Sequence, residues 1–96
     1  MDLGEIIQRK EGTIVDVRTP AEYSGGHAAG SINIPLQEIG HRLEELKDLK
    51  KPLVLCCASG GRSRQATSYL ERNDIACVDG GSWIDVHYFQ EQQVKS

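Results

Sequence analysis

The sequence contains only three cysteines among its 96 residues, and their arrangement excludes two common uses of that residue. Cys56 and Cys57 are adjacent and Cys77 is isolated, so the odd number of thiols gives no disulfide framework and fits a reducing compartment. No Cys-x-x-Cys pair occurs, and the three histidines are scattered, so the spacing of a zinc site is absent. The sequence therefore predicts no bound metal and gives no sign of a cofactor.

Long apolar runs and an excess of positive charge are also missing. The longest apolar runs are only a few residues, so we expect no segment that spans a membrane. Met1 is followed by Asp2 and Glu5 rather than by the basic and apolar regions of a signal peptide. The net charge is −3 and no basic stripe with interleaved aromatic residues occurs, which argues against a nucleic-acid partner. Together with the cysteine usage, these absences favour a cytoplasmic location.

The remaining composition is that of an ordinary small globular protein, with 39% hydrophobic and 26% charged residues. A chain of this length buries roughly 60–70% of its unfolded surface, so we expect one domain, residues 1–96, with a modest core. Short apolar runs alternate with helical patterns along the chain. The expected strands are residues 13–17, 31–34, 53–56 and 75–78. The expected helices begin near Asp2 and Thr19 and cover residues 36–49, 62–72 and 83–93.

Alternation of strands and helices predicts a fold of the α/β class, with a parallel sheet and helices on both of its faces. Ligands of such sheets bind at the carboxyl ends of the strands. Three features of the sequence are expected at that end: Arg18, the loop that follows residues 53–56, and a Gly80-Gly81 turn.

The stretch after the third expected strand has the residues of an anion-binding loop with a nucleophile. The apolar run ends at Cys57, and a helical pattern opens at Arg62 and Ser63; between them lie the small residues Ala58, Ser59, Gly60 and Gly61. A strand, a tight loop and a helix start direct successive backbone N–H groups at one point. The same groups, with Arg62, favour a thiolate on a cysteine placed there.

Six short motifs, in this order, resemble the signature of rhodanese-like domains. They are Ile14-Val-Asp-Val-Arg18, Glu22-Tyr23, Gly26-His27, Gly30-Ser-Ile-Asn-Ile-Pro35, Cys57-Ala-Ser-Gly-Gly-Arg-Ser63 and Gly80-Gly81. The match runs from about residue 13 to 83, which is most of the chain. The resemblance implies a small parallel sheet of four or five strands with helices on both faces.

The resemblance also implies a sulfurtransferase without a metal or cofactor. Cys57 would take sulfur from thiosulfate or a persulfide, become a persulfide, and pass that sulfur to cyanide or a thiol, with a protein acceptor as a further option. The donor would be held by Ala58, Ser59, Gly60, Gly61, Arg62 and Ser63, and Arg64 could help Arg62 to steer the thiosulfate dianion. Asp16 and Arg18 would lie beside the site and mainly tie the fold together through charge-assisted hydrogen bonds.

The adjacent cysteines leave a second interpretation open. Arg62 follows Cys57 by five positions, as in sulfur carriers of this family, and follows Cys56 by six, the Cys-x5-Arg-Ser spacing of cysteine phosphatases and arsenate reductases. Three features favour Cys57. Gly60 falls where the sulfurtransferase loop has glycine, Leu55 occupies the position where phosphatase loops commonly have histidine, and the loop has no Asp or Glu as a general acid. Cys56 would then pack inward as a small apolar residue.

A non-enzymatic alternative is a sulfur carrier or regulatory module that binds a partner and turns over little by itself. The intact cysteine loop argues against a purely structural role. Ala58 occupies a position where many relatives have a bulkier or basic residue. This departure leaves three donors open: thiosulfate, a low-molecular-weight persulfide and a protein persulfide.

Overall fold

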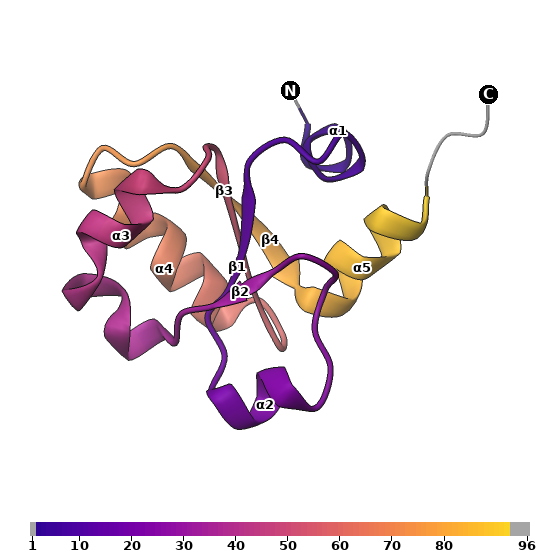
Figure 1. Cartoon of the computed structure of the whole chain (residues 1–96), viewed down its shortest axis with the longest axis horizontal. Coiled ribbons are helices and arrows are strands. Elements are labelled where there is room, and N and C mark those ends of the chain that lie inside the picture. Colours follow the sequence, from indigo (N-terminus) through magenta and orange to yellow (C-terminus); the bar gives the residue numbers. More distant parts are fainter. Residues whose placement is uncertain (1, 93–96) are drawn as a thin grey trace.

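A computed structural model describes residues 2–92 of the chain (Figure 1). The elements are α1 (Leu3–Gln8), β1 (Thr13–Asp16), α2 (Pro20–Ser24), β2 (Ile32–Asn33), the 3-10 helix η1 (Leu36–His41), α3 (Leu43–Asp48), β3 (Leu53–Cys57), α4 (Gly61–Arg72), β4 (Cys77–Ser82) and α5 (Trp83–Glu91). The four strands form one parallel sheet in the order β2-β1-β3-β4. The predicted α/β class with a small parallel sheet is confirmed.

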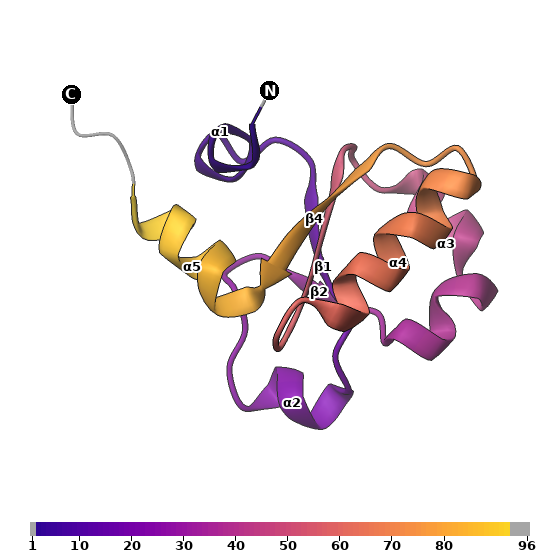
Figure 2. The same cartoon turned by 180° about the vertical axis from the view of Figure 1, so that it is seen from behind.

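Helices cover both faces of the sheet (Figures 1 and 2). On one face, η1, α3 and α4 pack against a core that includes Val15, Leu55 and Cys57. On the other face, α1 and α5 pack against a core that includes Val54 and Cys56. All five side chains of the central strand β3 are buried, and successive residues of a strand point to opposite faces. The two adjacent cysteines therefore lie on opposite sides of the sheet.

Two helix starts follow directly from local sequence. Asp2 caps α1, because its side chain accepts a hydrogen bond from the Glu5 N–H at 2.9 Å. Thr19 and Glu22 form a capping box at the start of α2, with Pro20 as the first helical residue. Both predicted starts are confirmed. Figures 1 and 2 show α2 at the same end of the sheet as the loop between β3 and α4.

The prediction of one continuous helix over residues 36–49 is wrong. The segment divides into η1 and α3, because Arg42 between them has φ −121° and ψ 29°, outside the α-helical region. Leu36 and Ile39 are three positions apart, which matches the turn of a 3-10 helix, and Gly40 disfavours a continued α-helix. The apolar spacing here suits a tighter helix than the one that we expected.

The predicted Gly80-Gly81 turn is also wrong, since both glycines lie inside β4. The strand begins later than residues 75–78 suggested and continues to Ser82. The register against β3 shifts between Asp79 and Gly81, so Gly80 is the extra residue of a β-bulge. The bulge keeps this part of the chain paired with β3 up to the level of Cys57.

Other element boundaries differ from the expected ones by one or two residues, which is the usual scatter at strand and helix ends. Residue 93, the expected end of the last helix, lies outside the described residues. Within residues 2–92, no helix is both long and apolar enough to cross a membrane.

Close packing at the bulge predicts that Gly80→Ala destabilises the fold. A Cβ at this position would lie 2.9 Å from a Val54 methyl group, 3.0 Å from the Leu55 carbonyl oxygen and 3.1 Å from a Val86 methyl group. We expect a loss of about 1–3 kcal/mol in the free energy of unfolding, measured by urea denaturation. Gly25→Ala is the matched control, because Gly25 is exposed with φ −77° and has only ordinary contacts. Equal urea midpoints for the two variants would contradict this packing.

Candidate active site

The loop between β3 and α4 folds backbone N–H groups around the sulfur of Cys57. The N–H of Gly60 donates a hydrogen bond to Cys57 Sγ at 3.0 Å, and the N–H of Ser63 donates one at 3.3 Å. Gly60 has φ +100°, a left-handed conformation that glycine adopts without steric cost and that turns the chain into α4. Cys57 is only 1% exposed and lies beneath Ala58, Ser59 and Gly61, which are exposed.

This environment favours the thiolate of Cys57. Burial raises the pKa of the thiol, but hydrogen bonds from the Ser63 side chain and from the N–H groups of Ser63, Gly60 and Ser59 outweigh burial. The pKa of Cys57 therefore falls below its usual value. The positive end of the twelve-residue helix α4 begins at the same place and acts in the same direction.

Cys56 has the opposite environment. Its side chain is fully buried in the core on the α1 and α5 side of the sheet. Burial, with a smaller contribution from the nearby Asp16, raises the pKa of its thiol to about 12. A thiol that stays protonated and faces away from the loop is a poor nucleophile, so the geometry disfavours the interpretation that centres on Cys56.

Ser63 lies inside the site, and its hydroxyl connects Cys57 to a residue that sequence reasoning missed. Ser63 Oγ accepts a hydrogen bond from the Cys57 thiol at 3.6 Å and donates its own proton to Asp79 Oδ1 at 2.7 Å. Once the thiol is ionised, the same hydroxyl can turn and donate to the sulfur. Asp79 also accepts a hydrogen bond from the Gly81 N–H at 3.0 Å. Asp79 directly precedes Gly80 and Gly81, and this position was the one feature of the sequence that could have drawn attention to it. The bulge that brings Asp79 next to Ser63 could not be seen in the sequence.

The Arg62 side chain forms an ion pair with a carboxylate of the protein, so its charge is already compensated before any anion binds. Its two terminal nitrogens donate to the two oxygens of Glu22 at 2.7 and 3.0 Å. Both side chains are 36% exposed. Hydrogen bonds from Arg62, and then from the Thr19 backbone, lower the pKa of Glu22 to about 2. In the sequence, Glu22 stands only in a short motif that resembles the family signature, and nothing there indicates this ion pair.

Asp16 and Arg18 form a buried pair beside the loop. Arg18 donates to both carboxylate oxygens of Asp16, with distances of 2.7–3.0 Å, and to the Gly26 carbonyl oxygen at 2.7 Å. The guanidinium also lies 5.0 Å from the ring centre of Trp83. The expected charge-assisted hydrogen bonds are present, and they join β1 to the turn after α2. Arg64, by contrast, is exposed on α4.

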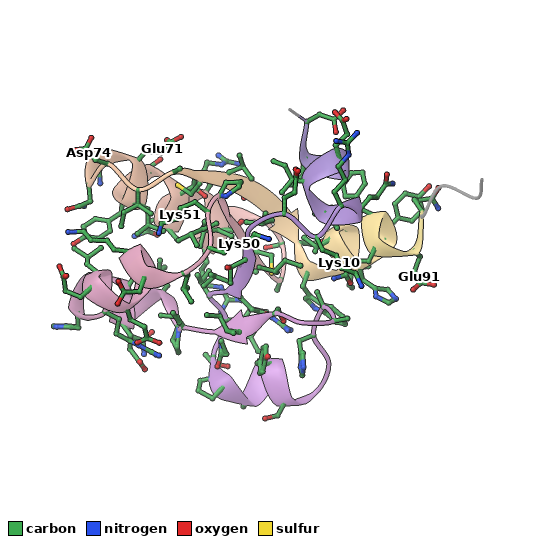
Figure 3. All side chains as sticks on the ribbon, turned by 45° about the horizontal axis from the view of Figure 1, so that its top comes forward. Lys10, Lys50, Lys51, Glu71, Asp74 and Glu91 are labelled. Carbon is green, nitrogen blue, oxygen red and sulfur yellow. The ribbon has the colours of Figure 1, made fainter. Side chains whose placement is uncertain are left out.

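A cavity of about 600 Å³ lies at the opposite end of the sheet, between the starts of β1 and β3 and the helices α1 and α5. Lys10, Lys50 and Glu91 are among the residues that line it (Figure 3). The cavity includes no residue of the Cys57 loop. Among residues 2–92, no three His, Cys, Asp or Glu side chains are grouped closely enough to hold a metal ion.

Comparison with known proteins places this geometry in a family. The model of the rhodanese-like domain matches residues 2–83. YqhL, an uncharacterised protein of Bacillus subtilis, is 38% identical over 75 residues, which are 75% of this chain and 59% of YqhL. Thiosulfate sulfurtransferase GlpE of Pseudoalteromonas translucida is 32% identical over 80 residues, which are 80% of this chain and 75% of GlpE.

Solved structures agree with the sequence comparisons. A rhodanese-related protein from Thermoplasma volcanium superposes with a TM-score of 0.75 and 36% sequence identity. The superposition covers 97% of this chain and 89% of that protein. The chain therefore belongs to the rhodanese-like domain family.

Proposed function

We propose that this chain is a sulfurtransferase that carries sulfur on Cys57. The observation that supports this most directly is the pair of N–H groups, from Gly60 and Ser63, that donate to Cys57 Sγ. These fixed donors stabilise a negative charge on sulfur without any rearrangement of the loop. The names of the GlpE relatives, thiosulfate sulfurtransferases, support the same chemistry.

The reaction has two half-reactions. In the first, the Cys57 thiolate attacks the outer sulfur of the donor, and the sulfur–sulfur bond of the donor breaks. The rest of the donor leaves with the electron pair, as sulfite from thiosulfate or as a thiolate from a persulfide. In the second, cyanide or an acceptor thiolate attacks the outer sulfur on Cys57 and releases the original thiolate. Sulfur moves as a neutral atom, so no external oxidant or reductant is needed.

The partners of the proposed reaction are a small sulfur donor and a thiol or cyanide acceptor. An acceptor protein with an accessible thiol would use the same step, because the loop residues Ala58, Ser59 and Gly61 are exposed. All three cysteines are free. We propose a reducing compartment such as the cytoplasm, where thiols of this kind persist.

The proposed role of Cys57 predicts a sulfur adduct on one cysteine only. After brief exposure to thiosulfate or cysteine persulfide, the intact protein and Cys56→Ala should each gain about 32 mass units, one sulfur atom on the nucleophile. Cys57→Ala should gain none, and cyanide should remove the adduct where it forms. Intact-protein mass spectrometry distinguishes the outcomes. An adduct retained in Cys57→Ala and lost in Cys56→Ala would assign the chemistry to Cys56.

The hydrogen bonds to Cys57 also predict the pH dependence of its reactivity. They lower the pKa of the thiol, so alkylation by iodoacetamide should reach half its maximal rate below the pH expected for an ordinary cysteine, about 8.5. Ser63→Ala removes the hydroxyl whose single proton can turn from Asp79 to the ionised sulfur, so the midpoint should move to higher pH. The rate at pH 7 should fall by about three- to tenfold, the effect of one hydrogen bond.

Ser68→Ala is the matched control for this pH profile, because Ser68 is exposed on the same helix and lies away from Cys57. It should leave the profile unchanged. An unchanged midpoint in Ser63→Ala would show that the Ser63 hydroxyl does not stabilise the thiolate.

A further inference from the structure

The single hydroxyl proton of Ser63 lies within reach of several acceptors. Ser63 is buried at the start of α4, and its Oγ accepts the hydrogen bond from the Cys57 thiol. The oxygens that can take the Ser63 proton are Asp79 Oδ1 at 2.7 Å, the Gly60 carbonyl at 3.1 Å and the Gly81 carbonyl at 3.4 Å. The Asp79 oxygen is the nearest and belongs to a carboxylate, so it takes the proton while Cys57 is a thiol.

Asp79 is held in the position from which it accepts this bond. In the sheet it pairs with Leu55, which packs in the core on the α4 side, so the side chain of Asp79 faces the same side. Its Oδ1 also accepts a hydrogen bond from the N–H of Gly81 at 3.0 Å, two residues further along the chain, as in an Asx turn. The bulge in β4 thus fixes the carboxylate beside Ser63, 16 positions away in the sequence.

Ionisation of Cys57 creates a second demand for the Ser63 proton. Burial raises the pKa of Cys57, and the Ser63 side chain is the largest of the groups that lower it. To donate to the thiolate, however, the hydroxyl must turn away from Asp79, because it has only one proton. The thiolate and the Asp79 carboxylate therefore compete for the same hydrogen bond.

Loading of sulfur ends this competition. The thiolate Sγ of Cys57 attacks the outer sulfur of thiosulfate, the new Sγ–S bond forms, and the sulfur–sulfur bond of thiosulfate breaks. Sulfite leaves with the electron pair. Sγ is then a neutral sulfur with two covalent bonds, and the negative charge lies on the outer sulfur. The Ser63 hydroxyl can then return to Asp79 and restore the charge-assisted hydrogen bond.

We propose that Asp79 is a positioning residue that, through the Ser63 hydroxyl, shifts Cys57 from the free thiolate toward the sulfur-loaded persulfide. This inference rests on the proposed sulfurtransferase function and names a residue that tunes the same site. The effect is the same for thiosulfate and for a persulfide donor, because Cys57 Sγ becomes neutral in either case.

The direct test is the equilibrium of loading in Asp79→Asn. The protein is equilibrated with mixtures of thiosulfate and sulfite at about pH 9, where an ordinary cysteine is largely ionised, and the loaded fraction is read by intact-protein mass. The amide keeps an oxygen for the Gly81 N–H but lacks the charge, so its bond with Ser63 is weaker. We expect the equilibrium constant for loading to fall about three- to tenfold. Cysteine persulfide with cysteine is the second donor couple and should give the same fall.

The pH profile of alkylation is a second readout, one that a merely structural role of Asp79 would not move. Without the competing carboxylate, the Ser63 proton is available to the thiolate. Asp79→Asn should therefore move the iodoacetamide midpoint to lower pH, opposite to the shift expected for Ser63→Ala. An unchanged loading equilibrium, or a midpoint that stays in place or rises, would overturn the proposal.

Asp85→Asn is the matched control for the loss of a negative charge. Asp85 is exposed in the first turn of α5, and its Oδ2 lies 3.9 Å from the position that a Cβ on Gly81 would occupy. Its carboxylate is thus close to the same bulge, but within residues 2–92 it makes no hydrogen bond with Ser63. This variant should leave the loading equilibrium and the alkylation midpoint unchanged.

A double variant tests whether Asp79 acts through the hydroxyl. In a Ser63→Ala background the shared proton is absent, so adding Asp79→Asn should change the loading equilibrium by less than about twofold. A full effect in this background, or in Asp85→Asn, would overturn the proposal. Every variant keeps the other charged groups near the loop, which are the ion pairs Asp16–Arg18 and Glu22–Arg62 and the exposed Arg64. Failure of both donors to load the unmodified protein would instead overturn the proposed function itself.

Discussion

The chemistry of the site depends on one interaction, the hydrogen bonding of the Cys57 sulfur by backbone N–H groups of the loop and the first turn of α4. These bonds require a loop that turns sharply, which the left-handed Gly60 allows. They also require a fixed strand before the loop and a fixed helix after it. The fully buried strand β3 provides the first, and the packing of α4 on the sheet provides the second. The loop can then stabilise an anionic sulfur without moving.

Strand geometry decides which of two adjacent thiols enters this loop. Because side chains alternate between the faces of β3, Cys57 faces the α4 side and Cys56 faces the α1 and α5 side. Burial then separates their chemistry further. The pKa of Cys56 rises to about 12, while hydrogen bonds lower that of Cys57. Adjacent residues of the same type thus have opposite properties.

Local features were predictable from the sequence, and long-range contacts were not. The capping box of Thr19 and Glu22 and the strand–loop–helix around Cys57 follow from residue order and short spacings. The pairing of Glu22 with Arg62 joins residues 40 positions apart, so no local pattern indicates it. The contact of Asp79 with Ser63 depends on the bulge in β4, which the sequence suggested only as a pair of glycines in a turn.

A crystal structure of the protein after loading with sulfur would test the role of this loop most directly. We predict an extra sulfur atom on Cys57 Sγ, within hydrogen-bond distance of N–H groups from residues 59–63. The loop backbone should keep the conformation described here, with Gly60 still left-handed. An extra sulfur bound to Cys56, or one on Cys57 that points away from the N–H groups, would show that this loop does not hold the transferred sulfur.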